Sequence, residues 1–288
     1  MNTLTRRQVA MMAGAGLLAP GALTRAAAQT GTITAGEVVA RIQKNLPPWQ
    51  TTRRDTFKTG GPDSVVRGIA SSFGGDLRVL QRSLAAGLNM VIVHEPTFYS
   101  DLDVIGWVKD DPLYKLKREW MDRNNVVVWR THDNWHARKP DGIRTGWERG
   151  IGWDKYAVSG NERIYRIPPT TLGELAKFIA TTLKSHSLRV MGDPALPVSV
   201  VARGGHQLQD NVTATTNCDC LLVSETREYD SYEYLRDSLL SGERKSAIII
   251  SHVTGEDEGM REMERWLTPL VPEVPVRFIS TDDAYWTV

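Results

Sequence analysis

Short apolar runs separated by amphipathic segments restrict this chain to a narrow class of folds. Runs of four to seven apolar residues, such as Met90-Val91-Ile92-Val93, recur between stretches with apolar residues three or four positions apart. Strands that are apolar on both faces are typical of parallel sheets covered by helices on both sides. The sequence therefore predicts an α/β fold with mainly parallel sheets.

The expected elements follow from this alternation. Strands are expected at 65–73, 89–93, 125–129, 198–202, 219–223, 246–250 and 274–279. Helices are expected at 76–86, 112–123, 171–184, 231–240 and 256–267. An irregular segment at 138–169 is the expected boundary if the chain forms two lobes.

The first 28 residues have the composition of a targeting segment. Arg6 and Arg7 precede a mild Ala/Gly/Leu stretch, and Ala26-Ala27-Ala28 supplies small residues for cleavage. The segment resembles a twin-arginine (Tat) export signal, which predicts a periplasmic or secreted protein that uses the Tat export machinery. An uncleaved amphipathic N-terminus or membrane anchor is the alternative.

The charge of the remaining chain argues against polyanionic partners. Removing residues 1–28 takes away three arginines and no acidic residue, which changes the formal charge from +1 to −2. No basic cluster is present, so neither nucleic acid nor an anionic membrane surface is an expected partner. No later apolar run is long enough to span a bilayer, so stable membrane insertion after cleavage is not expected.

The two cysteines, Cys218 and Cys220, are separated by one residue in a predicted strand. A disulfide between residues so close in sequence would be strained. Buried free thiols are therefore expected rather than a disulfide or a metal site.

Histidines and acidic residues collect where predicted strands end. Five of the six histidines follow a predicted strand, and Glu95, Glu225 and Glu256 lie in similar positions. Functional groups of open α/β sheets gather at this edge, and imidazoles with carboxylates are suitable ligands for divalent metals. Each histidine taken alone could equally be a polar residue with satisfied hydrogen bonds or a helix cap. Together, the imidazoles and carboxylates at this edge predict a site for divalent metal.

One pair has a favourable spacing. His252 and Glu256 are four residues apart at a helix start, which places both on one face. Pro96 follows His94 and Glu95 directly, and it turns the chain away because it has no N–H for the sheet. The apolar run at 90–93 is therefore an interior strand that carries His94 and Glu95 to the sheet edge.

These motifs resemble the Nif-three-like dinuclear metal-centre family, also labelled GTP cyclohydrolase I type two-like. The matching stretches are GLN…HEP.F at 87–98, HDNWH at 132–136, SE at 224–225 and SHVTGE at 251–256. Two positions depart from the family pattern, with Glu95 in place of a histidine and His136 in place of an aspartate. Asp133 is a possible substitute for that aspartate. The resemblance implies two divalent metal ions (Zn, Fe or Mn) held by His94, Glu95, His136, His252 and Glu256.

The resemblance also implies an architecture and an assembly. Two similar α/β lobes are expected, with the second inserted into the first. The first would comprise 29–141 and 245–288, and the second 142–244. A homo-oligomer, in this family a hexameric ring, is the expected assembly.

The predicted function is an exported, dinuclear-metal-dependent hydrolase that acts on a small cyclic or heterocyclic substrate through a metal-activated water. His132, His206 and Glu225 are the candidates for proton transfer. Arg130, Arg203 and Arg227 are candidates for anion binding, although surface salt bridges are the commoner role of arginine. GTP is not the expected substrate of an exported protein. The Trp-rich stretch 135–153 would either line a substrate pocket or pack on the lobes. A non-catalytic metal carrier or sensor, and a ring protein stabilised by metal, are the alternatives.

Overall fold

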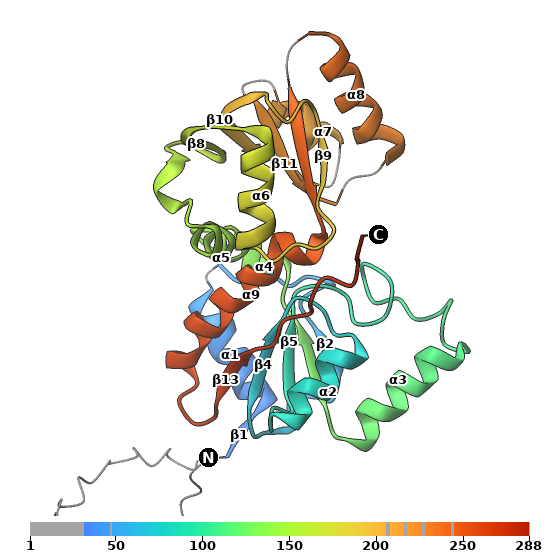
Figure 1. The fold of residues 1–288 in the computed structure, drawn as a ribbon. Coiled ribbons are helices and arrows are strands. Elements are labelled where there is room, and N and C mark those ends of the chain that lie inside the picture. The colour runs from blue at the N-terminus through green and yellow to red at the C-terminus, as the bar shows by residue number, and fades with distance from the viewer. Residues whose placement is uncertain are drawn as a thin grey trace, which may run out of the picture.

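The computed structural model describes residues 32–46, 48–205, 208–215, 218–225, 228–242 and 245–287. It has two α/β lobes, shown one above the other in Figure 1. The predicted α/β class is confirmed. The expected Tat signal at 1–28 lies outside the described residues.

The first lobe is built on a five-stranded sheet with the order β13-β4-β5-β6-β2. The strands β13 (Val276–Phe278), β4 (Ile69–Ser72), β5 (Met90–Val93) and β6 (Val127–Arg130) are parallel, and β2 (Phe57–Thr59) is antiparallel to β6. The expected strand at 65–73 is divided, because Val65–Val66 forms β3 and pairs with β1 (Ile33–Thr34) in a separate two-stranded sheet.

Helices cover both faces of the first sheet. One face packs on α1 (Ala35–Asn45) and α9 (His252–Leu267), and the other on α2 (Leu77–Ala85) and α3 (Pro112–Arg123). Successive residues of a strand point to opposite faces, so the apolar run of β5 supplies Met90 and Ile92 to one core and Val91 and Val93 to the other. This two-sided burial explains the continuous apolar run.

The second lobe has a six-stranded sheet with the order β7-β8-β10-β11-β12-β9. Its strands are β7 (Ala157–Val158), β8 (Asn161–Thr171), β9 (Arg189–Met191), β10 (Pro197–Arg203), β11 (Cys220–Ser224) and β12 (Ser246–Ile250). The central strands β10, β11 and β12 are parallel, whereas the outer pairings are antiparallel. Helix α6 (Leu172–Thr182) covers one face, and α7 (Leu208–Thr215) and α8 (Glu233–Leu240) cover the other.

The chain leaves the first sheet after β6 and returns to it only at β13, after the whole second sheet. The expected division at residue 245 is corrected in one respect: β12 pairs with β11 and β9 of the second sheet, so the second lobe extends to Ile250. A uniformly apolar strand such as β12 can be buried in either sheet, and its sequence does not specify which.

The helix boundaries depend on polar caps. Asp76 caps α2 by accepting the N–H of Val79, and Ser251 caps α9 by accepting the N–H of Thr254. Helix α9 consequently begins at His252, four residues before the predicted start, which places His252 and Glu256 on one helix.

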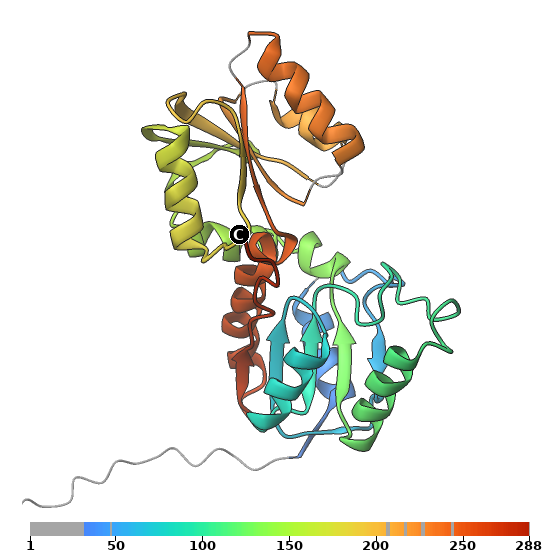
Figure 2. The same ribbon diagram turned by 45° about the vertical axis from the view of Figure 1, so that its right-hand side comes forward.

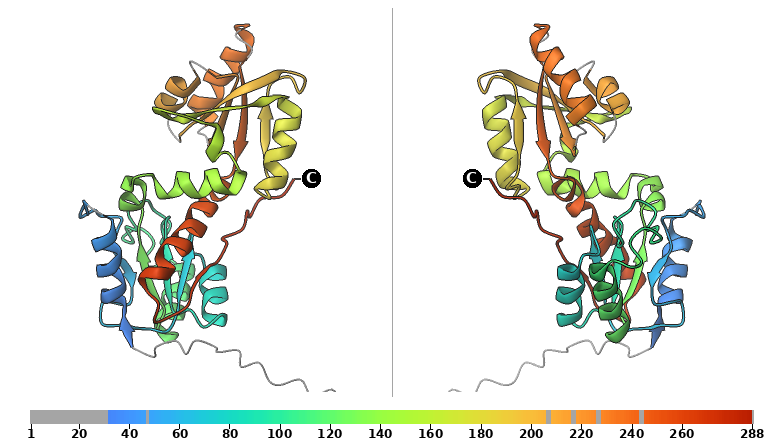
Figure 3. Two further views of the ribbon diagram at one scale, coloured as in Figure 1. Left: turned by 90° about the vertical axis from the view of Figure 1, so that its left-hand side faces the viewer. Right: turned by 90° about the vertical axis from the view of Figure 1, so that its right-hand side faces the viewer.

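The two lobes meet where α5 (Gly142–Ile151) crosses α9. Figure 3 shows α5 lying across the first lobe beside α9. A Cβ atom added to Gly146 would be only 2.2 Å from the carbonyl oxygen of Glu258, so the two helix backbones touch at this crossing. The short helix α4 (Asp133–Ala137) precedes α5.

Other features of the chain agree with this arrangement. Cys218 and Cys220 are buried and form no disulfide, as expected, and burial raises the pKa of their thiols to about 11 and about 12. The C-terminal segment runs from β13 toward the second lobe (Figure 2), where Asp283 accepts a hydrogen bond from Ser187. Among the described helices, none has the length and apolar character needed to cross a membrane.

Candidate metal centre

The candidate site lies at the carboxyl ends of β5 and β6, beside the start of α9. Strand β5 ends at Val93, so His94 is the first residue beyond the sheet, and its side chain is completely buried. The Nδ1 atom of His94 lies 3.2 Å from the carbonyl oxygen of Thr131, at the end of the neighbouring strand. This contact leaves Nε2 as the nitrogen that faces the site.

The turn after β6 is held in place by a buried carboxylate. Asp55 accepts hydrogen bonds from the backbone N–H groups of His132, Asp133 and Asn134 at 2.7 to 3.1 Å. These three donors belong to the first residues of α4 and the residue before it, where backbone N–H groups have no partner within the helix. Asp55 therefore fixes the orientation of α4, which carries His136.

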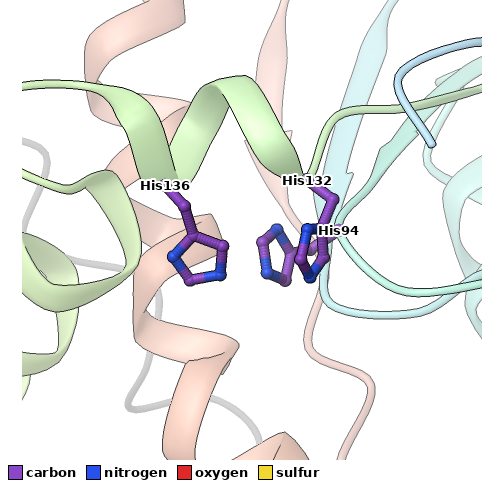
Figure 4. A group of neighbouring side chains, drawn as sticks. All are labelled: His94, His132 and His136. Carbon is purple, nitrogen blue, oxygen red and sulfur yellow. The ribbon is translucent and has the colours of Figure 1, made fainter. Parts of the chain in front are cut away.

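Three imidazoles gather below α4, as Figure 4 shows. His94, His132 and His136 each offer a nitrogen, and these three atoms lie within 4.8 Å of one another. The rings of His94 and His132 are stacked with centroids 4.4 Å apart, and His136 lies 4.9 Å from each of them, edge-on. Nitrogens bound to one ion at about 2.1 Å lie within about 4.2 Å of each other, so small side-chain adjustments would complete such a site.

A second group shares His94 with the first. His94, Glu95 and Glu256 offer ligand atoms that also lie within 4.8 Å of one another. The Oε2 atom of Glu256 is 3.3 Å from His94 Nε2 and 3.1 Å from His252 Nε2, so His252 adjoins this group. Four imidazoles and two carboxylates thus converge on one small volume.

The donor atoms fit a bound cation. His94 Nε2 and Glu256 Oε2 are both buried, and within the described part of the chain neither has a hydrogen-bond partner of normal geometry. Their contacts with each other and with His252 are ion pairs without good hydrogen-bond geometry, and coordination of a metal ion would satisfy both atoms directly. The buried histidine and glutamate groups could therefore hold a metal ion.

Burial and charge set the protonation of these groups. Burial lowers the pKa of His94, which favours the neutral imidazole that a metal requires. Burial would also lower the pKa of His252, but its contacts with Glu225 and Glu256 outweigh burial and raise the pKa to about 10. The pKa of Glu256 is held well below its usual range, against the effect of burial, by His252 and His94. A proton on His252 therefore balances the buried carboxylate when no cation does.

Arg130 orients Glu95 rather than binding an external anion. Its guanidinium is completely buried and donates to the carbonyl oxygens of His94 and Asp101. Its Nη2 atom lies 3.2 Å from Glu95 Oε2. The other oxygen, Oε1, lies 3.5 Å from His132 Nε2 and 3.7 Å from His252 Nε2, so it faces the site.

The predicted proton-transfer residues have different locations. His132 belongs to the three-histidine group itself. Glu225 lies 2.9 Å from Nδ1 of His252, on the opposite side of the ring from Glu256, and thereby orients that imidazole. His206 lies outside the described residues, as does Arg227, and neither is placed.

Two further predicted residues contact the protein around the site. Asp133 lies 2.9 Å from Nδ1 of His132 and is also paired with Arg54, so it orients His132 and belongs to neither group of ligand atoms. Arg203 donates to the carbonyl oxygen of Gly255 and stacks over the ring of Trp147. Part of the Trp-rich stretch therefore packs in the protein interior, since Trp135 and Trp147 are buried.

Sequence reasoning missed two carboxylates that support the ligands, Asp55 and Asp141. Asp141 lies 2.9 Å from Nδ1 of His136 and caps α5. Its position just before a helix start was a usable signal, because aspartate is a favoured cap. Asp55 lies in an irregular segment and has no comparable signal.

Comparison with known proteins gives one family. The model of the family Duf34/NIF3 (NGG1p interacting factor 3) matches residues 33–284 of this chain. Among curated proteins, no match is found.

Several solved structures share the fold. The hypothetical protein SA1388 of Staphylococcus aureus is 13% identical, with 90% of this chain and 100% of that chain covered and a TM-score of 0.71. A Bacillus cereus protein related to NIF3 is 12% identical, with 89% and 99% covered and a TM-score of 0.72. The protein TTHA1606 from Thermus thermophilus is 14% identical, with 86% and 95% covered and a TM-score of 0.57. At such low identity these structures share the architecture and carry no argument about chemistry.

Proposed function

Because the chain belongs to the Duf34/NIF3 family, we propose that it is a metal-dependent hydrolase acting on a small cyclic or heterocyclic substrate. The observation that carries this proposal is the convergence of four imidazoles and two carboxylates around the buried His94, which leaves His132 available for proton transfer beside five ligands. The one free nitrogen of His94 can bind a single ion, so a second, closely spaced ion would use the remaining donors.

His94, Glu95, His136, His252 and Glu256 would hold two divalent ions, which we propose to be Zn, Fe or Mn. Neutral imidazole and carboxylate suit all three metals, so the donor set alone does not select one. When bound, such ions supply Lewis-acid polarisation of the bond under attack and activation of water near neutral pH.

The residues around the ligands have complementary roles in this proposal. His132 would hold or accept a proton at Nε2, because Asp133 occupies its Nδ1 and Glu95 Oε1 lies 3.5 Å from Nε2. Glu225 and Asp141 would keep His252 and His136 in a fixed orientation. Arg130 would hold Glu95 so that only one carboxylate oxygen faces the ions.

We further propose that the protein is exported by the Tat pathway, is cleaved after Ala28 and acts in the periplasm or outside the cell as a homo-oligomer. The paired Arg6 and Arg7 and the alanines at 26–28 support export. Replacing both arginines by lysine and locating the protein by cell fractionation tests this proposal. Sedimentation of the purified mature protein tests the assembly, for which the family resemblance suggests a hexamer.

The hydrolase proposal is tested with purified mature protein. Elemental analysis should give about two ions per chain, and a panel of cyclic amides, cyclic amidines and esters should include a compound that is hydrolysed. Hydrolysis should stop on chelation and return when metal is added. Bound metal without any turnover, together with a lower melting temperature on chelation, would instead support a metal carrier or a ring protein stabilised by metal.

A further inference from the structure

A cleft of about 440 Å³ lies beside the candidate metal centre, and its lining includes Phe73, Glu95, Thr97 and Tyr99. We infer that this cleft binds the ring of the substrate, and that the ring is an uncharged or cationic nitrogen heterocycle rather than an anion. The inference rests on the proposed function, because it names the substrate class for that site.

The cleft and the candidate metal centre share a wall. Glu95 lines the cleft, and its carboxylate oxygen Oε1 lies 3.5 Å from His132 Nε2. Phe73 also lines the cleft, and its ring meets the ring of His252 edge-on at a centroid distance of 5.0 Å. A ligand in the cleft is therefore in reach of both ligand groups.

The size and the walls of the cleft suit a ring system. Small-molecule sites are usually clefts of about 300–1,000 Å³ with aromatic and apolar linings, and this cleft is near the lower end of that range. Phe73, Pro96 and Tyr99 provide flat or apolar surface. One or two fused rings would fit within such a volume and leave room for a substituent.

Tyr99 is held in an unusual backbone conformation at the edge of the cleft. Its φ angle is +62°, in the left-handed region that a tyrosine rarely adopts. Asp103 fixes this loop, because its Oδ1 atom accepts the N–H groups of Thr97 and Phe98, each at 2.7 Å. Such conformations persist where the surroundings enforce them, and they are frequent at ligand sites.

The charge of the cleft disfavours an anion. Asp76, Glu95 and Asp101 line it, against a single ammonium group from Lys117. The Lys117 Nζ atom already donates to the carbonyl oxygen of Thr97 at 2.5 Å. Arg130 and Arg54 pair with Glu95 and Asp101 from outside the lining, so the negative charge that an anion would meet comes mainly from Asp76, whereas the N–H groups of a neutral or cationic ring would find carboxylate oxygens as acceptors.

One polar atom in the wall, Oγ1 of Thr97, has no hydrogen-bond partner among the described residues. Thr97 is 1% exposed, and in the described part of the chain its Oγ1 atom makes no hydrogen bond. A buried hydroxyl group of this kind usually has a partner, and a ring nitrogen or carbonyl of a ligand would provide one. This atom is independent of the charge argument and supports the same site.

Two conservative substitutions test the inference. Thr97→Val keeps the shape and removes only the unpartnered hydroxyl group. Asp76→Asn removes a negative charge but keeps the cap of α2, because asparagine caps as well as aspartate. The matched controls are Ser185→Ala, which removes a buried hydroxyl without a partner outside the cleft, and Asp111→Asn, which changes the cap of α3.

The metal-loaded protein is titrated by calorimetry with adenine as a neutral bicyclic probe, 2-aminobenzimidazole as a cationic one and inorganic phosphate as an anionic one. We expect the wild type to bind a heterocycle more tightly than phosphate. Thr97→Val should weaken that binding about 10-fold, and Asp76→Asn should weaken the cationic probe more than adenine, with no effect of either control. Metal content should be unchanged in all four variants.

The inference is overturned if phosphate binds more tightly than either heterocycle, or if Thr97→Val and Asp76→Asn both bind as the wild type does. Its failure can be told from failure of the proposed function because binding is measured without turnover. Heterocycle binding that depends on Thr97, without hydrolysis of any compound, would support the assignment of the cleft and contradict the proposal that the protein is a hydrolase.

Discussion

Asp141 contacts the Nδ1 atom of His136 at 2.9 Å through one carboxylate oxygen and caps helix α5 through the other. One side chain thus fixes both the start of a helix and the orientation of an imidazole. With Nδ1 occupied by Asp141, His136 has only Nε2 available for a cation. Carboxylates that support metal-bound histidines in this way make the imidazole a stronger ligand.

We predict that Asp141→Asn lowers metal affinity about 10- to 100-fold, the usual range for loss of such a supporting contact. The asparagine oxygen can still cap α5, but an amide N–H₂ facing Nδ1 favours the tautomer with its proton on Nε2, which cannot bind metal. Competition with a chromogenic chelator measures the affinity. Asp111→Asn, which alters the cap of α3, is the control. Equal affinities for Asp141→Asn and the wild type would show that His136 is not a ligand.

Substitution of Glu256 tests the metal site more directly than Asp141→Asn does, because both histidines beside Glu256 face the same oxygen atom. Its Oε2 atom lies 3.3 Å from His94 Nε2 and 3.1 Å from His252 Nε2. We predict that Glu256→Gln, which keeps the size of the side chain and removes its charge, reduces bound metal by at least one ion per chain. Elemental analysis of protein purified without chelators measures this, with Glu264→Gln on the same helix as the control. Retention of the full metal content would exclude Glu256 as a ligand.

The parallel strands and most of the site were predictable from sequence because a buried strand has a simple pattern. The run at 90–93 predicted both β5 and the position of His94 and Glu95 at the sheet edge. The carboxylate that fixes α4 was not predictable, because Asp55 contacts residues 132–134 from about eighty positions earlier in the sequence. The sheet to which β12 belongs was also not predictable, because an apolar strand is compatible with either lobe.

Arg130 and Glu95 should be strongly coupled. We predict that Arg130→Met lowers the free energy of unfolding by about 3–5 kcal/mol, because it removes the buried donor to Glu95 Oε2 and to the carbonyl oxygens of His94 and Asp101. Adding Glu95→Gln should recover part of this loss, since the side chain at position 95 then carries no charge. Urea denaturation of the wild type, both single variants and the double variant measures the coupling. Additive effects of the two substitutions would contradict the pairing.

Lys117 should make stability depend on pH in the alkaline range. Burial lowers the pKa of its amine from 10.5 to about 8 in the folded state. Between these values the unfolded chain binds more protons than the folded chain, so the contribution of Lys117 to stability rises with pH. Below about pH 8 the amine is protonated in both states, and the free energy of unfolding carries the full cost of burying its charge. The total change in the free energy of unfolding is about 3 kcal/mol.

We predict that the difference in unfolding free energy between the wild type and Lys117→Met shifts in favour of the wild type from pH 7.5 to pH 10. Taking the difference cancels the titration of the other lysines and tyrosines. Lys115→Met, at an exposed position of the same helix, should show no such shift. A pH-independent difference would mean that the amine of Lys117 titrates normally.

The crossing of α5 and α9 leaves no room for a side chain at Gly146. In an open helix, alanine would stabilise by about 1 kcal/mol relative to glycine. At Gly146 the added Cβ atom would lie 2.2 Å from the carbonyl oxygen of Glu258 and 2.6 Å from the Cα atom of Gly259, and backbone atoms cannot rotate away. The helices must then separate, so we predict that Gly146→Ala destabilises the protein by about 1–3 kcal/mol. Thermal unfolding measures the loss, with Gly61→Ala as the control because its Cβ atom would meet nothing within 4 Å.

The same substitution should also weaken metal binding, because the crossing holds two parts of the site together. Asp141 stands at the start of α5 and orients His136, whereas Glu256 belongs to α9. Separation of the two helices moves these carboxylates relative to each other, so Gly146→Ala should lower metal affinity together with stability. Chelator competition at a temperature where the variant is still folded measures the affinity. Lower stability with unchanged metal affinity would show that the crossing does not position the ligands.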